Sequence, residues 1–262
     1  MTDHTLEAQG LTLAYDKRVI SEDLSTHVPV GSFTAIIGPN ACGKSTLLRA
    51  FARLLSPRAG RVVLDGRDIA SRGAKELARE LGLLPQTSLA PDGIRVADLV
   101  ARGRFPHQRV FDRWSPDDEA AVLRAMTATD VLDLSGRLVA ELSGGQRQRV
   151  WVAMALAQET PVLLLDEPTT FLDIAHQIEV LELFRSINLE DGRTLVAVLH
   201  DLNQAARYAS HIIAMRSGSI VAAGAPADVI TPEIVEDVFS VPCRVIDDPE
   251  SRTPLVIPLV RR

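Results

Sequence analysis

A short segment combines two glycines, a lysine and a hydroxyl side chain in the order that phosphate binding requires. It reads Gly38-Pro39-Asn40-Ala41-Cys42-Gly43-Lys44-Ser45 and fits the pattern G-x-x-x-x-G-K-[ST]. Glycines let the backbone wrap around phosphate, and the N–H groups then form an anion-binding nest. Lys44 adds a positive charge for the β- and γ-phosphates, and the Ser45 hydroxyl can ligate Mg²⁺. We predict that residues 38–46, ending at Thr46, bind ATP and Mg²⁺; a glycine turn with an unrelated lysine is the alternative.

Two carboxylates stand at the end of an apolar run. Asp166 and Glu167 follow Val162–Leu165, which is typical of a buried parallel strand. Open α/β sheets bind ligands at the carboxyl ends of their strands, where these acids would emerge. Asp166 is therefore a candidate to hold Mg²⁺ through water, and Glu167 is a candidate general base that polarises an attacking water. A solvated strand end remains the alternative, because Asp-Glu-Pro also forms turns.

The segment Leu142-Ser143-Gly144-Gly145-Gln146 is identical to the signature sequence of ABC proteins. With the motifs above, the chain resembles an ABC-type nucleotide-binding domain over nearly its whole length. The resemblance implies an α/β fold, an ABC-type P-loop NTPase with a RecA-like mixed-sheet core, an N-terminal antiparallel β subdomain and a helical signature subdomain. Ser143 and the amides of Gly144 and Gly145 at a helix N-terminus would form a second anion site. In the family, that site receives the γ-phosphate of ATP bound to another subunit, so we expect a homodimer.

Four further residues match positions of the family in the correct order. Tyr15 stands where an aromatic ring stacks on adenine, although a buried core tyrosine is the alternative. Gln86 matches the glutamine that contacts Mg²⁺ and the hydrolytic water, and His200 matches the histidine that contacts the γ-phosphate. Asp173 matches an interface aspartate, but Thr170-Phe171 before it departs from the commoner Ser-Ala. The resemblance thus makes Glu167, His200 and Gln86 catalytic, and Ser45, Gln86 and Asp166 the metal-binding group.

Two positions inside the phosphate-binding segment raise separate questions. Ala41 stands where many relatives have glycine, and an alanine is tolerated there if its φ is negative. Cys42 would lie near a helix N-terminus, where the pKa of a thiol can be depressed and the thiol reactive. A small buried filler is the other interpretation of Cys42. We expect nucleotide binding to survive the departure at Ala41.

The elements that must position these residues can be outlined from patterning. We predict strands at Phe33–Ile37, Val162–Leu165 and Thr194–Leu199, and helices at Thr46–Leu55, Val96–Gly103 and Pro116–Thr129. The resemblance implies one ABC domain over 1–262. Its core with the β subdomain would take 1–86 and 151–262, its helical subdomain 87–150, and a C-terminal extension 224–262.

Composition limits the classes of partner. The 262 residues include 46% hydrophobic side chains and carry a net charge of -6, which argues against nucleic acid or anionic lipid as the main partner. Two cysteines are too few for a disulfide framework, so a reducing compartment is expected. The sequence has neither a secretory signal pattern nor an apolar run that could cross a bilayer. Any action at a membrane would therefore depend on a partner.

The resemblance sharpens to the ATPases of bacterial importers for ferric siderophores (the ferric enterobactin type), haem and cobalamin. The segments that carry it are 100–107, Thr169–Asp173, His200–Ala205 and the tail 224–258. It implies an ATP-hydrolysing subunit that drives uptake of an iron-siderophore complex, peripheral on the cytoplasmic face of the inner (plasma) membrane. Two permeases would dock on the helical subdomain, and a periplasmic or lipid-anchored binding protein would deliver substrate. Cobalamin or haem import, or a soluble non-transport ABC ATPase, are the alternatives.

Four large apolar side chains in the helical subdomain have two possible roles. Candidates for a docking groove in the helical subdomain are Phe105, Val110, Phe111 and Trp114. Ordinary subdomain core is the alternative interpretation of these four residues. An exposed apolar patch in the isolated chain would favour docking.

Overall fold

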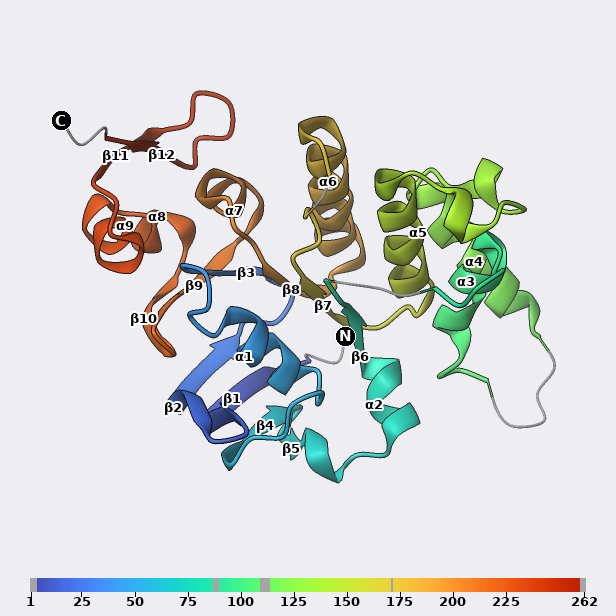
Figure 1. Ribbon diagram of the computed structural model, residues 1–262, viewed down its shortest axis with the longest axis horizontal. Coiled ribbons are helices and arrows are strands. Elements are labelled where there is room, and N and C mark those ends of the chain that lie inside the picture. The colour runs from blue at the N-terminus through green and yellow to red at the C-terminus, as the bar shows by residue number, and fades with distance from the viewer. Residues whose placement is uncertain (1–3, 87–89, 109–113, 171, 260–262) are drawn as a thin grey trace.

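The computed structural model describes residues 4–86, 90–108, 114–170 and 172–259 (Figure 1). Val110, Phe111 and Phe171, which the sequence analysis singled out, lie outside these residues. A mixed sheet forms the centre of the described chain, with strand order β10-β9-β3-β8-β7-β6. Its strands are β3 (Phe33–Ile37), β6 (Leu81–Leu84), β7 (Val162–Asp166), β8 (Thr194–Val198), β9 (His211–Arg216) and β10 (Ser219–Gly224). Neighbouring strands are parallel except for β10, which pairs antiparallel with β9.

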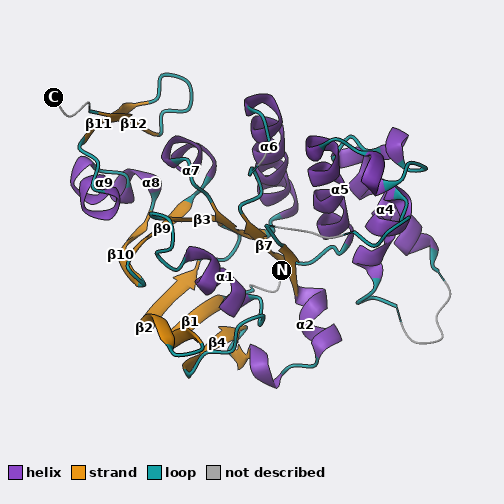
Figure 2. Ribbon diagram, viewed as in Figure 1, coloured by secondary structure: helices purple, strands orange, loops and turns teal. Residues whose placement is uncertain are grey.

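Side chains that alternate along these buried strands divide the interior into two hydrophobic layers. In β7, Leu163 and Leu165 belong to one core cluster, whereas Val162 and Leu164 belong to the other. Successive side chains of a strand point to opposite faces, so both faces of the sheet need a cover. Figure 2 shows most of the helices on one face and a second sheet with α1 (Lys44–Phe51) on the other.

The second sheet is antiparallel, as the resemblance implies for the N-terminal part of the chain. Its order is β2-β1-β4-β5, formed by β1 (Leu6–Tyr15), β2 (Arg18–Val28), β4 (Ala59–Leu64) and β5 (Arg67–Asp68). A 3₁₀ turn (Ile69–Ser71) and α2 (Ala74–Glu80) connect it to β6. Leu6, Leu11 and Leu13 of β1 are fully buried against α1 and the central sheet. This packing fixes α1 between the two sheets.

The helical signature subdomain contains α3 (Val96–Ala101), α4 (Pro116–Ala128) and α5 (Gly144–Ala157), with 3₁₀ turns at Arg102–Arg104, Leu132–Leu134 and Val139–Glu141. Its polar centre is Arg104, which is 6% exposed and pairs with Asp118 at 2.9 Å. Arg104 also contacts Glu159 at 2.8 Å. A Cβ atom at Gly103 would overlap the carbonyl oxygen of Met154. Glycine at this position thus allows the chain after α3 to approach α5 closely.

The remaining elements continue the helical layer toward the C-terminus. They are α6 (Ile174–Asp191), α7 (Leu202–Tyr208), α8 (Pro226–Val229), α9 (Pro232–Phe239) and the hairpin of β11 (Cys243–Asp247) and β12 (Pro254–Pro258). The hairpin lies beyond α9, on the same side of the central sheet as α7 (Figure 1). Among the described residues, no helix combines the length and apolar character that a membrane span needs.

The predicted fold class is confirmed, and the predicted strands agree with β3, β7 and β8 within one residue. Two helix predictions need correction. The helix expected at Thr46–Leu55 begins at Lys44 and ends at Phe51, because Arg53 adopts a left-handed conformation with φ 57°. The helix expected at Val96–Gly103 ends at Ala101 and continues as a 3₁₀ turn.

Candidate nucleotide-binding site

The segment 38–45 forms a loop between β3 and α1, as predicted. Gly38 and Gly43 have φ values of 151° and 108°, which side chains larger than hydrogen rarely adopt. A Cβ atom at Gly38 would overlap the carbonyl oxygen of Met215, so only glycine fits there. Lys44 is 5% exposed, and its Nζ donates hydrogen bonds to the carbonyl oxygens of Gly38 (2.8 Å) and Pro39 (2.9 Å). The ammonium group thereby lies across the loop at the start of α1.

The structure corrects the expectations for two residues of the loop. Ala41 has φ 61°, whereas an alanine was expected to fit here only with a negative φ. The loop therefore carries backbone strain at this position. Burial raises the pKa of the Cys42 thiol, and this effect outweighs the attraction of Lys44. The side chain is only 4% exposed. The expectation of a depressed pKa is therefore wrong, and burial favours the interpretation of Cys42 as a small buried filler.

The end of β7 brings the first predicted acid to the loop. The Ser45 hydroxyl donates a 2.8 Å hydrogen bond to Oδ1 of Asp166, which is 4% exposed. Burial raises the pKa of Asp166 above its ordinary value, although the Ser45 hydrogen bond partly offsets this effect. The pair presents two oxygen ligands of the kind that Mg²⁺ prefers. Gln86, the third predicted metal ligand, donates through its Nε2 to the neighbouring acid, Glu167.

Glu167 is the centre of a hydrogen-bonded group. Gln86 Nε2 donates to its Oε2 at 2.6 Å, Thr170 Oγ1 donates to the same oxygen at 3.0 Å, and His200 Nε2 lies 2.7 Å from its Oε1. Burial raises the pKa of Glu167, but the bonds from His200, Thr170 and Gln86 outweigh it and hold the pKa below its usual range. Glu167 also has φ 53°, a conformation that stores strain and is often found at functional sites. The three predicted catalytic residues thus come together, with their carboxylate ionised.

A cavity of about 250 Å³ lies between the loop and this acid. Its lining contains Asn40, Ala41, Gly43, Lys44, Ser45, Thr46, Glu167 and His200. It also contains Arg18 and Ile20 from β2, which the sequence analysis did not identify. In the sequence, only the nearby Tyr15 could have indicated that Arg18 and Ile20 line a nucleotide site. A basic and an apolar residue in a strand form no recognisable binding motif. The hydrogen bond from Thr170 to Glu167 could not be predicted either, because the sequence places Thr170 only in the motif around the interface residue Asp173.

Tyr15 ends β1 and is 40% exposed, so the alternative of a buried core tyrosine is wrong. Its hydroxyl accepts a 3.3 Å hydrogen bond from Arg49 Nη1. Tyr15 does not line the Lys44 cavity. It lines a second cavity together with Asp166 and Gln86, which are hydrogen-bonded to Ser45 and Glu167 of the first. The exposed Tyr15 ring can stack on a planar ligand that enters this second cavity.

The signature residues are not part of the Lys44 cavity. Ser143 caps α5, where its Oγ accepts from Gln146 N at 3.2 Å, and Gln146 Oε1 accepts from Ser143 N at 3.1 Å. This reciprocal capping box leaves Ser143 and Gly144 exposed. Asp173 caps α6 through His176 N at 3.0 Å and is also exposed. Within the described chain, α5 packs on the face of the central sheet opposite α1.

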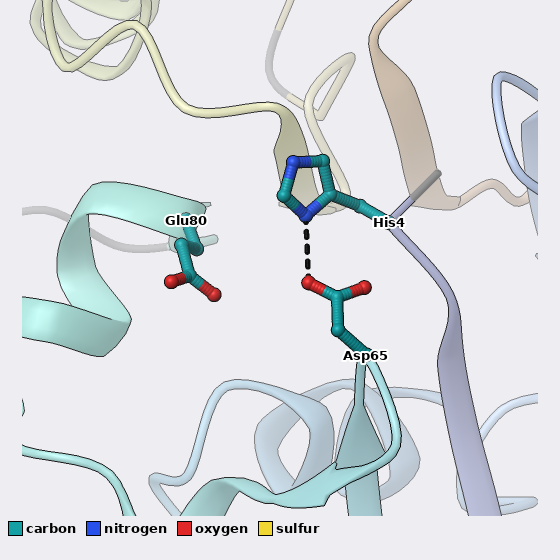
Figure 3. Close-up of side chains that lie close together, drawn as sticks. All are labelled: His4, Asp65 and Glu80. Carbon is teal, nitrogen blue, oxygen red and sulfur yellow. Dashed lines mark hydrogen bonds and ion pairs between the residues drawn. The ribbon is translucent and has the colours of Figure 1, made fainter. Parts of the chain in front are cut away.

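Among the described residues, one other group has the composition of a metal site, and its contacts argue for a structural role. His4, Asp65 and Glu80 bring their ligand atoms within 4.8 Å of one another (Figure 3). His4 Nδ1 pairs with Asp65 at 2.8 Å, whereas Glu80 is ion-paired with Arg72. The arginine already neutralises Glu80. The group ties the start of β1 to the turn after β4.

Comparison with known proteins decides the family. The family model described as "ABC transporter" matches residues 21–170. The chain belongs to the ABC transporter family. It is 56% identical to the ferric enterobactin transport ATP-binding protein FepC of Escherichia coli (strain K12), over 98% of this chain and 94% of that protein. It is 51% identical to the probable siderophore transport system ATP-binding protein YusV of Bacillus subtilis (strain 168), over 97% and 92% of the two chains.

Solved structures of ABC proteins share the architecture. A metal-chelate type ABC transporter in an inward-facing conformation superposes with a TM-score of 0.84 at 27% identity, covering 99% of this chain and 98% of that chain. A dimeric bacterial ABC transporter cassette superposes with a TM-score of 0.75 at 26% identity, covering 84% and 98%. Membership in this family makes the chain an ATPase.

Proposed function

We propose that this chain is the ATP-hydrolysing subunit of a bacterial importer for an iron-siderophore complex. The observation that carries the hydrolytic part is the position of Glu167, held by Gln86 and His200 at the cavity that contains Lys44. The transport part is supported by the similarity to FepC over nearly the whole of both chains. A cobalamin importer is the weaker candidate, because the similarity to the BtuD protein of Halobacterium salinarum is 39% and covers 64% of that protein.

Residues of the Lys44 cavity and of the neighbouring Tyr15 cavity have separate roles in this proposal. Lys44 and the backbone N–H groups of residues 40–45 bind the phosphates, and the exposed Tyr15 ring stacks on the adenine. Glu167 accepts a proton from the attacking water, because it is the ionised acid at the cavity. His200 and Gln86 orient Glu167 and the water. When bound, Mg²⁺ would neutralise charge on the phosphate oxygens, and Ser45, Asp166 and Gln86 are the residues that would hold it.

A second copy of the chain would complete the site. Ser143 and Gly144 are exposed at the N-terminus of α5, where the backbone N–H groups and the helix dipole favour an anion. Because α5 and α1 lie on opposite faces of the central sheet, a twofold dimer is the simplest arrangement that places one signature on the partner's γ-phosphate. Gly145, Gln146 and Asp173 would belong to the same interface. ATP would then favour the closed dimer, and hydrolysis would release it.

Two exposed aromatic side chains support docking to permeases. Phe105 is 64% exposed and Trp114 is 45% exposed, so neither is ordinary subdomain core. Lys75 Nζ lies 4.8 Å from the centre of the Phe105 ring, which holds that ring at the surface. In this proposal a cytoplasmic helix of each of two permeases covers these rings, and the chain is peripheral on the cytoplasmic face of the membrane. A binding protein would act only through the permeases.

Uptake of radioactive iron tests the proposal. Cells that lack the endogenous subunit would carry the wild-type chain, Glu167→Gln or Glu190→Gln, the last being the same change at an exposed residue of α6. We expect Glu167→Gln to abolish uptake of ferric siderophore, while Glu190→Gln and the entry of haem and cobalamin remain normal. Unchanged iron uptake with Glu167→Gln would reject the siderophore assignment. If Glu167→Gln abolishes entry of cobalamin or haem instead, the chain would be assigned to the importer of that compound.

A further inference from the structure

The short helix α7 follows His200 directly and has attachments on several sides. Asp201 caps it, accepting from the N–H groups of Asn203 (2.8 Å) and Gln204 (2.9 Å). Gln204 Nε2 donates to Gln177 Oε1 of α6 at 2.9 Å. A helix of seven residues is marginal on its own and depends on such tertiary contacts for its position.

Asn203 of α7 makes two hydrogen bonds to the C-terminal hairpin. Val256 N donates to Asn203 Oδ1 at 2.7 Å, and Asn203 Nδ2 donates to Val256 O at 3.3 Å. Both polar backbone groups of Val256 are therefore bound to one side chain. In the hairpin, Val256 stands opposite Val245, and its backbone groups point away from β11. The side-chain amide of Asn203 thus makes the two hydrogen bonds that a third strand would make at the free edge of β12.

The hairpin is itself attached to the body of the protein. Val256 is 6% exposed and Cys243 is 8% exposed, and both belong to the main core cluster, against which Val245 also packs. Arg207 of α7 lies 3.6 Å from Asp248, which follows β11. The hairpin is thus a packed element that can hold α7, rather than a loose tail.

His200 depends on α7 for its orientation because few other contacts hold it. Its side chain is 44% exposed, and its Nε2 lies 2.7 Å from Oε1 of Glu167. On its N-terminal side the backbone is fixed, since Leu199 N donates to Ile36 O at 3.2 Å. On its C-terminal side it passes into Asp201 and α7. A displacement of α7 would therefore move the imidazole relative to Glu167.

We propose that Asn203 is a positioning residue for hydrolysis, and that the hairpin β11–β12 acts through it to hold His200 against Glu167. This inference rests on the proposed roles of Glu167 and His200 in hydrolysis. Catalytic groups displaced by about 1 Å can lose up to two orders of magnitude in rate. Loss of Asn203 leaves the loop 38–45 intact, so it should lower kcat and not the affinity for ATP.

The test compares Asn203→Ala with Asn188→Ala in the full-length chain. Asn188 is a matched control, because its Nδ2 also donates two hydrogen bonds to backbone oxygens, those of Gly31 (2.9 Å) and Arg193 (2.7 Å), at the end of α6. Phosphate release would be measured at a temperature where both variants are folded and would be normalised to the number of ATP-binding sites. The ring resonances of His200 in labelled protein would report its environment. A third variant, Val256→Pro, removes the backbone N–H group that donates a hydrogen bond to Asn203 Oδ1.

We expect Asn203→Ala to lower kcat about tenfold, with KM for ATP within twofold of wild type and a shifted His200 resonance. Val256→Pro should lower kcat similarly, and the double variant should lose no more than either single one. Asn188→Ala should lower thermal stability and leave kcat and the His200 resonance unchanged. Equal kcat values for Asn203→Ala and wild type, or an equal loss in Asn188→Ala, would overturn the inference. A wild-type chain without hydrolysis would instead reject the proposed function.

Discussion

The imidazole Nε2 of His200 lies 2.7 Å from Oε1 of Glu167, although the two residues follow different strands. The register explains this contact. Strands β7 and β8 are parallel neighbours, with Asp166 beside Val198, so the residues just beyond each strand emerge at the same edge of the sheet. Glu167 also accepts hydrogen bonds from Gln86 and Thr170. The geometry thus places the candidate general base in its ionised form at the cavity of Lys44.

The left-handed conformation of Ala41 should respond to a glycine. We expect Ala41→Gly to raise the free energy of unfolding by about 0.5–1 kcal/mol, because glycine adopts φ 61° without steric cost. Ala52→Gly is the control, since Ala52 has φ -75° and gains nothing from glycine. Urea unfolding would measure both changes. Equal destabilisation by the two substitutions would show that Ala41 is not strained.

The thiol of Cys42 should be slow to react in the folded protein. Its raised pKa keeps it protonated at pH 7 and its burial blocks access, so labelling by a maleimide should be at least about tenfold slower than in urea. The rate should rise with pH as thiolate forms. The experiment uses a Cys243→Ala background, so that Cys42 is the remaining cysteine. Labelling at pH 7 as fast as that of an unfolded thiol would restore the reactive interpretation.

The buried pair of Arg104 and Asp118 should make stability depend on pH. Burial raises the pKa of Asp118, but hydrogen bonds from Arg104 and Ser115 outweigh it, and the folded pKa lies below the ordinary value. Its stabilising effect is therefore complete above the ordinary carboxyl pKa of about 4 and disappears as pH falls through the lower folded pKa. We expect Asp118→Asn to cost about 3 kcal/mol at pH 7 and progressively less below about pH 4.

Urea unfolding at pH 7, 5 and 3 would measure this difference. Asp117→Asn is the matched control, because Asp117 is the preceding residue on α4 and is exposed. It should change stability by less than about 0.5 kcal/mol at every pH. A difference for Asp118→Asn that stays constant between pH 7 and 3 would contradict a role of the ionised pair.

Local patterns predicted the parts of the site that lie at strand and helix ends. The apolar runs that became β3, β7 and β8 are continuous because both faces of the sheet are covered, and this is visible in the sequence. The order of acids and glycines beyond these strands then located Lys44, Ser45, Asp166 and Glu167. Strand direction alone brings such ends together at one edge.

Features that depend on tertiary contacts could not be predicted in this way. Helix α1 ends at Phe51 because Arg53 turns left-handed, and its guanidinium donates to the carbonyl oxygens of Ile69 and Arg72. The burial of Cys42 depends on packing in the second core cluster, around Met215 from a distant strand. Arg18 reaches the cavity only because β2 lies beside the loop. None of these contacts has a signature in the local sequence.

Release of phosphate by the purified chain tests the central claim most directly. Steady-state rates would be compared for wild type, Glu167→Gln and the control Glu190→Gln, with ATP binding and dimer content measured in the same samples. Glu167→Gln removes the proton acceptor and keeps the shape of the site, so we expect ATP to remain bound, dimers to accumulate and turnover to fall at least about a hundredfold. Glu190→Gln should match wild type. Normal steady-state hydrolysis by Glu167→Gln would contradict the assignment of Glu167 as the general base.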